Sequence, residues 1–258
     1  IAGVLNQSAS QIIYPLVRDG EEGVRELGIY GACIKIAMIM AMITQAFRYA
    51  YEPIVFAGAK DRDSKEMYGK AMKFFIIFTL LAFLCVIGFL DVLKYIIGEG
   101  YREGLRVVPI VMAAEIMMGI YFNLSFWYKL IDQTLWGALF SGAGCLALFA
   151  VNFIFIPKIG YMACAWAGVA GYGIAMLLSY FVGQKKYPIA YPLKDIAIYV
   201  IAAAVIYCGM LLTSKYLGTI PQLAVNCVLI ALFCALIVKR DLPLSDLPVI
   251  GKHFRKSC

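Results

Sequence analysis

Long apolar runs separated by short polar segments form the pattern of this chain. The runs are unbroken rather than alternating, and most approach the roughly 20 residues that a helix needs to cross a bilayer. We therefore predict an all-α integral membrane protein, a polytopic bundle of eight transmembrane helices. The expected spans are Ile1–Val17, which is truncated, Ile29–Ala57, Met72–Ile97, Leu105–Leu130, Leu135–Ile156, Tyr161–Val182, Ile196–Leu217 and Leu223–Val238.

The second predicted helix carries polar residues inside a run that is apolar enough to span a membrane. At about 100° per residue, one of its faces collects Tyr30, Ile34, Ala41, Gln45, Arg48 and Glu52. A charged side chain deep in hydrocarbon costs several kcal/mol or more unless it faces a polar cavity. This face therefore predicts a water-filled path or a binding cleft, which makes the chain a transporter candidate.

Two interpretations of this face remain open. Arg48 and Glu52 lie four residues apart, so they can pair with each other near the membrane interface while Arg48 extends toward water. Alternatively, Arg48 supplies a fixed positive charge to a cavity, with Gln45 as a hydrogen-bond donor, because a guanidinium stays protonated and fits phosphate oxygens. Lys35 lies on a different face of the same helix, and its side chain either faces the cavity or extends outward.

Other helices also contain polar residues. Asn6 and Gln7 in the first helix either share the cavity or form hydrogen bonds between helices. Glu115 lies well inside the fourth helix, so it is a candidate proton or sodium site, or else the partner of a Lys or Trp nearby. Asn152 and Asn226 are isolated and are interpreted as structural.

Composition narrows the function classes. Hydrophobic residues make up 63% of the chain and charged residues 15%, against roughly 25% charged residues in soluble domains. The net charge of +7 indicates basic cytoplasmic loops rather than a nucleic-acid partner. The eight cysteines form no CxxC motif or Cys/His cluster, so we expect no metal and no cofactor. The lone His253 lies in the tail and no catalytic motif occurs, so we expect no enzyme.

Basic residues predict the topology. They concentrate in three segments, which are Lys60–Lys73, Lys185–Lys194 and Lys239–Lys256. These segments fall on one side of the predicted bundle, which the positive-inside rule assigns to the cytoplasm together with the C-terminus. The chain begins at Ile1 inside an apolar run, which indicates the C-terminal part of a longer polytopic chain.

Three local features are also predicted. Pro53 is expected to bend the second helix. Asp61–Lys73 is expected to form an interfacial helix or a solvated loop. Pro157–Gly160 is expected to form a tight turn.

Several stretches resemble one family, the Wzx-type polysaccharide flippases of the multidrug/oligosaccharidyl-lipid/polysaccharide superfamily. ELGIYGACIKIAMIMAMITQAFRYAYEPIVF is similar to their eighth helix and GEGYREGLRVVPIVMAAEIMMGIYFNLSFWYKL to their tenth. NFIFIPKIGYMACAWAGVAGYGIAMLLSYFVGQKKYPIAYP is similar to the hairpin of the eleventh and twelfth helices. LNQSASQIIYPL is similar to the seventh, but Ser10 and Gln11 stand where the family often has Asp-Arg.

The resemblance implies a transporter of two six-helix lobes around a central cavity, plus two further helices. It assigns residues 1–183 to the second lobe, 184–238 to the two extra helices and 239–258 to a cytoplasmic tail. The implied activity is the transfer of undecaprenyl-diphosphate-linked oligosaccharide across the bacterial inner membrane, with membrane lipids, the missing N-terminal lobe and a polysaccharide polymerase as partners.

The resemblance also implies roles for individual residues. Aromatic and amide groups that would hold sugars are Tyr30, Tyr49, Tyr51, Tyr121 and Asn123. Arg48 and Lys35 would hold the diphosphate, and Glu115 or Glu52 would couple transport to an ion gradient. Two rival functions are an antiporter of drugs or cations from the same superfamily, which predicts an acidic cavity, and a non-transporting membrane scaffold.

Overall fold

The computed structural model describes residues 13–17, 20–57 and 64–241. Seven helices in these ranges are long and apolar enough to cross a membrane. The elements are α2 (Glu21–Ala57), α3 (Ser64–Gly88), α4 (Leu90–Leu93), η1 (Lys94–Ile96), η2 (Glu99–Val107), α5 (Val108–Leu124), α6 (Phe126–Leu130), α7 (Leu135–Ile159), α8 (Met162–Lys186), α9 (Leu193–Tyr216) and α10 (Thr219–Asp241). The prediction of an all-α polytopic membrane bundle is confirmed. The first predicted helix falls mostly outside the described residues.

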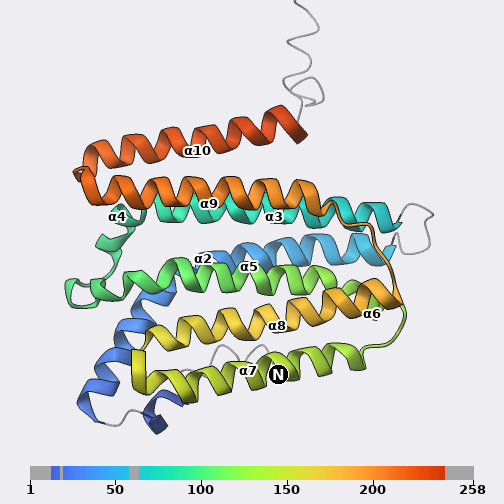
Figure 1. The fold of residues 1–258 in the computed structure, drawn as a ribbon, viewed down its shortest axis with the longest axis horizontal. Helices are drawn as coiled ribbons and strands as arrows, with labels where there is room; N and C mark the ends of the chain where they lie inside the picture. Colours follow the sequence, from blue (N-terminus) through green and yellow to red (C-terminus); the bar gives the residue numbers. More distant parts are fainter. Residues whose placement is uncertain (1–12, 18–19, 58–63, 242–258) are drawn as a thin grey trace, which may run out of the picture.

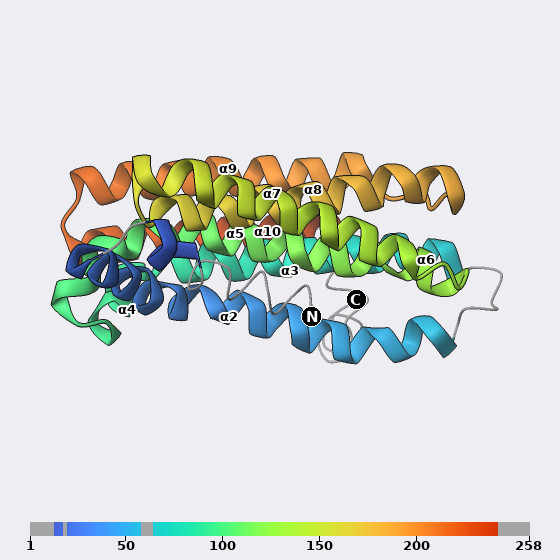
Figure 2. The same ribbon diagram turned by 90° about the horizontal axis from the view of Figure 1, so that it is seen from below.

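The helices lie side by side with α5 near the middle. α5 packs against α2, α3 and α8, while α7 and α8 form a hairpin on one flank. α9 and α10 pack on each other and on α3 at the opposite flank (Figure 1). Figure 2 shows α2 along one edge of the bundle and α8 and α9 along the opposite edge, with α7 running obliquely from that edge toward the middle.

Many side chains of the outer helices are exposed and apolar, as expected for a surface in contact with lipid. Examples are Leu146 on α7, Val205 on α9 and Val228 on α10. The buried core instead includes Phe75 on α3 and Met112 on α5. The hydrophobic effect does not drive association between helices in lipid, so small residues and polar contacts have a larger part in holding them together.

The α7–α8 hairpin depends on two glycines that face each other. A Cβ atom at Gly144 would lie 2.6 Å from the carbonyl oxygen of Gly171, and one at Gly171 would lie 2.8 Å from that of Gly144. Such contacts let two helix backbones approach closely where there is no hydrophobic driving force. The Gly- and Ala-rich sequence of α8 therefore has a packing role.

Several predicted boundaries need correction. α2 begins at Glu21 rather than Ile29, since Glu21 and Glu22 favour the first turn of a helix. α3 begins at Ser64, so the charged stretch from there to Lys73 is neither a separate interfacial helix nor a loop. α3 also ends early, at Gly88, whose carbonyl accepts a hydrogen bond from Asn226 at 2.9 Å.

Two further corrections concern turns and proline. The predicted turn from Pro157 is wrong, because α7 continues through Pro157 to Ile159 and ends where Gly160 takes a φ of 59°. The bend predicted at Pro53 stays a prediction, and α2 continues beyond it to Ala57.

The described parts of the basic segments lie toward one end of the bundle. α6 and the linker from α8 to α9 lie at the right-hand end of Figure 1, and α10 runs from the left toward that side. Contacts agree: Lys73 pairs with Asp241 at 2.6 Å, and Lys186 donates to Gln133. Their grouping at one end matches the predicted topology, and the assignment of that end to the cytoplasm stays a prediction.

Candidate functional site

A polar cavity of about 410 Å³ lies beside the second half of α2, where α2 crosses α5 and α8. We call it the polar cavity after its polar lining residues Thr44, Gln45, Tyr49, Glu115 and Tyr172; the rest of the lining is apolar and includes Met38, Met42, Met118 and Phe122. It contains Gln45 and Ala41 from the polar face that the sequence predicts. The face therefore lines an open cavity over at least this part of its length.

Close packing of α2 on α5 positions the cavity. A Cβ atom at Gly119 would lie 2.9 Å from the Thr44 methyl group and 2.2 Å from the ring of Phe75. Only glycine fits between these two side chains, so α5 can approach α2 at this level. Glu115, one turn earlier on α5, then lies beside Thr44 and Gln45.

Three ionised side chains form a cluster that adjoins the cavity. Lys129 Nζ donates to Glu52 Oε1 at 2.6 Å, and Arg48 Nε lies 3.6 Å from Glu52 Oε2. The Arg48 distance is too long for a hydrogen bond, and Arg48 Nε is buried with no hydrogen-bond partner among the described residues. We call Arg48, Glu52 and Lys129 the ion cluster; its formal charge is +1.

Aromatic rings hold the Arg48 guanidinium in place. Its Cζ atom lies 4.9 Å from the centre of the Phe122 ring and 5.4 Å from that of Tyr49, and both rings line the polar cavity. A cation over a ring face is attracted to it without using its N–H donors. The guanidinium therefore keeps donors for a ligand that enters the cavity.

The end of the fourth predicted helix presents Lys129 to Glu52. α5 ends at Leu124 and α6 begins at Phe126, but Ser125 between them keeps a helical backbone and its N–H donates to the Tyr121 carbonyl at 2.9 Å. The chain therefore continues in a nearly helical path to Lys129. The expected span Leu105–Leu130 lies within the span Glu99–Leu130, which begins with the 3-10 helix η2.

Glu115 also lines a second, smaller space, the inner chamber, of about 50 Å³. Tyr30, Asn152 and Tyr172 line it as well. Glu115 and Tyr172 thus stand between the inner chamber and the polar cavity, near the middle of the span Glu99–Leu130. Within the described ranges, the Glu115 carboxylate has no hydrogen bond or ion pair, which contrasts with its predicted Lys or Trp partner.

Buried polar atoms around these two spaces lack partners. Thr44 Oγ1 and Gln45 Oε1 at the polar cavity, and Asn152 Oδ1 at the inner chamber, make no hydrogen bond in the part of the chain that the structure describes. An unpaired buried polar group costs about 1–3 kcal/mol, so such groups usually meet water or a ligand. These three atoms indicate a hydrated path that continues past Glu115.

The remaining predicted site residues are dispersed. Tyr30 is buried at the inner chamber, and Tyr49 is 68% exposed at the rim of the polar cavity. Lys35 is exposed and lines neither space. Asn6 and Gln7 lie outside the described residues.

Two predicted residues of α5 point elsewhere. The Tyr121 hydroxyl lies 2.9 Å from Ser141 Oγ and donates to the Gly137 carbonyl, so Tyr121 packs against α7. Asn123 Nδ2 donates to the Gly119 carbonyl of its own helix at 3.1 Å. Neither residue lines the polar cavity or the inner chamber.

Sequence reasoning missed Lys129 and Tyr172. Lys129 lies near the end of the predicted span Leu105–Leu130 and was given no role, although a lysine directly after an aromatic run at the end of a span is a recognisable interfacial position. Tyr172 lies among small residues of α8 and carries no pattern that distinguishes it.

The fold and the site together define a multi-pass, all-α membrane protein with a polar cavity and charged residues inside its spans. In the comparison with solved structures, the chain is similar to the lipid II flippase MurJ in its inward closed conformation, with a TM-score of 0.69 and 15% sequence identity. The match covers 92% of this chain and 52% of that one, so the chain spans about half the length of the flippase. No family model and no curated protein matches the sequence.

Proposed function

We propose that this chain is the C-terminal part of a flippase that moves undecaprenyl-diphosphate-linked oligosaccharide across the bacterial inner membrane. The observation that carries the proposal is the ion cluster of Arg48, Glu52 and Lys129, which adjoins the polar cavity through the Tyr49 and Phe122 rings that contact Arg48. Residues 1–183 would form the second lobe, 184–238 the two extra helices and 239–258 a cytoplasmic tail. Alternating access would come from rocking of this lobe against an N-terminal lobe.

The charges suit a diphosphate. Glu52 contacts both cations of the ion cluster, so it holds them in the membrane when no ligand is present. Two cations against one carboxylate leave a net positive charge, which attracts phosphate strongly in a medium of low dielectric constant. An incoming diphosphate would take over the free Arg48 donors, while the lipid tail stays in the bilayer.

Glycan contacts would come from the rim of the cavity. Tyr49 presents an exposed ring there, and Gln45 has a buried amide oxygen without a hydrogen-bond partner among the described residues. These are the aromatic and amide groups that sugars need. Lys35 and Tyr121 have no part in this proposal, because they line neither space.

Glu115 is the proposed ion-coupling residue. Its carboxylate lies between two spaces and has no described hydrogen-bond or ion-pair partner, so a proton or a sodium ion can neutralise it. We expect Glu115→Gln to remove any dependence of the transport rate on pH or sodium. A wild-type rate that does not change with pH or sodium contradicts the coupling role.

Two features support a lipid-linked anion over the rival functions. The fold is similar to that of a protein named as a lipid II flippase. The lining of the polar cavity contains the acidic residue Glu115 and no cation, as an antiporter of cationic drugs would require, whereas the adjoining ion cluster has a net positive charge, which favours an anion. A non-transporting scaffold does not require an open cavity next to the Arg48 guanidinium, whose Nε donor has no hydrogen-bond partner among the described residues.

The test is restoration of surface polysaccharide in a bacterium that lacks its own polysaccharide flippase, with the intact protein expressed at matched membrane levels. Wild type should restore the polysaccharide, and Arg48→Ala or Lys129→Ala should lower it at least tenfold. Arg48→Lys tests whether charge suffices without the guanidinium fork. Arg25→Ala is the matched control, because Arg25 is an exposed cation on the same helix that pairs with Glu103.

Full activity of both alanine variants contradicts the proposed path. Loss of activity in Arg25→Ala as well would show that any charge removed from α2 impairs folding. If wild type fails, the assay is repeated with a glycan from the source organism. Failure there too contradicts the flippase function.

A further inference from the structure

A further cavity of about 390 Å³ lies at the other end of the bundle, away from the basic linkers, where α9 ends and α10 begins (Figure 1). We call it the end cavity. Its walls come from the end of α3, α4, the start of α5, α9 and α10, and it shares no residue with the polar cavity. Its volume lies in the range of small-molecule sites.

The floor of the end cavity is polar but neutral. Asp91 accepts hydrogen bonds from Lys94 Nζ at 2.8 Å and from Gln222 Nε2 at 2.7 Å, so both carboxylate oxygens are used. Gln222 is 8% exposed, and its Oε1 atom remains as an acceptor. Because Lys94 offsets the charge of Asp91, the floor does not repel an anion.

Arg106 supplies a cation at the edge of this cavity. The nearby acids of η2 already have partners: Glu103 pairs with Arg25 at 3.5 Å and Glu99 with Arg102 at 3.2 Å. In residues 20–57 and 64–241, no carboxylate lies within ion-pair distance of Arg106. The guanidinium is therefore available to an anionic group.

The rest of the wall is mainly apolar, with Ser214 and Asn226 as further polar residues. Ile87 on α3, Leu105 on η2 and Met210 and Leu211 on α9 line it. The Tyr207 hydroxyl has no hydrogen bond within the described ranges. A ligand that fits must have an anionic group at Arg106, hydroxyl or ester groups near Gln222 and Tyr207, and a hydrocarbon part. A phospholipid has all three and is present at the membrane surface.

We propose that the end cavity binds a membrane phospholipid, with its phosphodiester at Arg106 and an acyl chain along Met210 and Leu211. Arg106 forms charge-assisted hydrogen bonds to the phosphate, and the apolar wall accommodates the acyl chain. The bound lipid bridges the start of α5 and the α9–α10 pair, which packs on the bundle mainly through α3. This site lies outside the proposed transport path.

The experiment is native mass spectrometry of the intact protein, purified in detergent and stripped of lipid. Phosphatidylglycerol is compared with diacylglycerol of the same acyl chains, which lacks the phosphate. We expect one phosphatidylglycerol to bind per protein, and diacylglycerol to bind at least tenfold more weakly. Arg106→Gln should weaken phosphatidylglycerol about tenfold or more, since it removes a hydrogen bond to a charged group.

Two matched controls separate the site from general effects. Lys215→Gln removes an exposed cation at the same end of the bundle that does not line the end cavity, so binding should be unchanged. Leu211→Trp fills the cavity and should abolish binding, whereas Leu212→Trp, on an exposed neighbour that does not line it, should not. Thermal unfolding without lipid verifies that each variant is folded.

The proposal is overturned by equal binding of phosphatidylglycerol and diacylglycerol, or by an Arg106→Gln variant that binds like wild type. Equal loss of binding in Arg106→Gln and Lys215→Gln also overturns it, because the lipid would then respond to surface charge alone. Binding that survives Leu211→Trp places the lipid elsewhere on the protein.

Discussion

Asn152 and Asn226 are both buried amides inside membrane helices, yet their surroundings differ. Asn226 Nδ2 donates to the Gly88 carbonyl at 2.9 Å and its Oδ1 accepts from Thr213 at 3.4 Å. Asn152 Oδ1 has no such partner in the described residues and faces the inner chamber. We therefore expect that Asn152, unlike Asn226, can be replaced without loss of stability.

We expect Asn226→Leu to lower the free energy of unfolding by about 1–3 kcal/mol, because it leaves the Gly88 carbonyl without its donor. Asn152→Leu should leave the free energy unchanged or raise it by about 1 kcal/mol, since it removes an unpaired buried polar atom. Chemical unfolding in detergent micelles measures both. A larger loss in Asn152→Leu would mean that its oxygen has a hydrogen-bond partner, such as a bound water molecule.

Glu52 competes with the proposed ligand for two cations. Glu52→Gln raises the formal charge of the ion cluster from +1 to +2, so we expect a polyprenyl diphosphate to bind more tightly, by about threefold to tenfold at low salt. Transport should slow, because release becomes harder. The measurement is ligand affinity at two salt concentrations, and an unchanged or weaker affinity would contradict the role of the cluster.

At the scale of single elements, the α7–α8 hairpin rests on the contact between Gly144 and Gly171. Gly144→Val should separate the two helices and lower the stability of the protein by about 1–3 kcal/mol. Gly142→Val is the matched control on the same helix, because a side chain at Gly142 meets no atom within 4 Å. Thermal unfolding of the two variants checks this, and equal midpoints would mean that the hairpin can open at no cost.

The existence and type of the long helices were predictable, because runs of about 20 apolar residues have few alternatives in a membrane. The polar face of α2 was also predictable, since Gln45, Arg48 and Glu52 share a helical period. The helix ends were less predictable. α2 begins about two turns before the apolar run, because acidic residues stabilise its first turn.

The ion cluster could be predicted only in part. Arg48 and Glu52 are near in sequence, whereas the partner Lys129 is 77 positions from Glu52. Its approach depends on how the end of the span Glu99–Leu130 packs beside α2, which a helical period within one segment does not specify. Tyr121 was misplaced for a similar reason, since its position on α5 turns it toward Ser141 of α7. Periodicity identifies a face of a helix but not the neighbour that the face meets.

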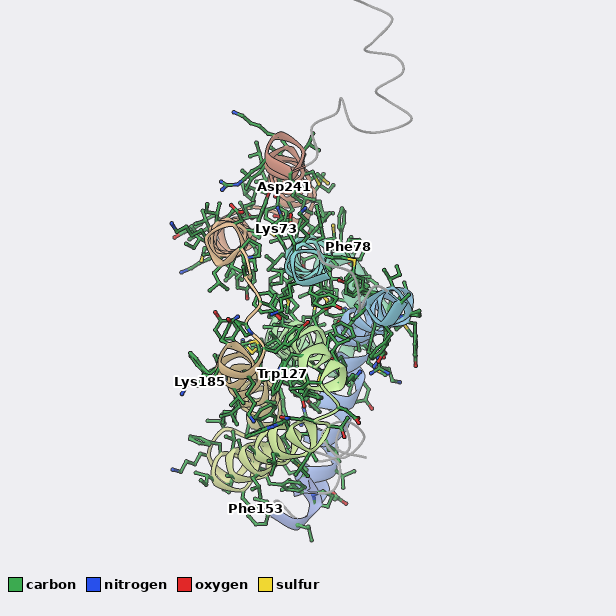
Figure 3. All side chains as sticks on the ribbon, turned by 90° about the vertical axis from the view of Figure 1, so that its right-hand side faces the viewer. Lys73, Phe78, Trp127, Phe153, Lys185 and Asp241 are labelled. Atoms are coloured by element: carbon green, nitrogen blue, oxygen red, sulfur yellow. The ribbon has the colours of Figure 1, made fainter. Side chains whose placement is uncertain are left out.

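At the scale of the whole molecule, a partly buried network holds α10 to the bundle. Lys73 on α3 and Tyr199 on α9 both donate to Asp241 at the end of α10, at 2.6 Å and 2.5 Å. Figure 3 shows Lys73 and Asp241 together where α3 meets α10. Arg240 adds a pair with Asp195 of α9 at 2.7 Å.

Lys73→Met should destabilise the protein by about 3–5 kcal/mol, because it leaves a largely buried carboxylate without its cation. Lys70→Met on the same helix should cost at most about 1 kcal/mol, since Lys70 pairs with Glu66 on the exposed surface. Limited proteolysis after α9 and thermal unfolding measure the two variants. Equal behaviour would mean that packing alone holds α10.

The long separation between Glu52 and Lys129 has a consequence for how the protein is made. α2 leaves the ribosome well before α6, so Glu52 enters the membrane with Arg48 as its sole partner in the ion cluster. The acid gains its hydrogen-bonded cation only when the later helices have been inserted and have assembled on α2. A chain whose synthesis stops before Lys129 therefore retains an incompletely neutralised acid in its membrane segment, a feature by which quality-control proteases can distinguish unfinished molecules from complete ones.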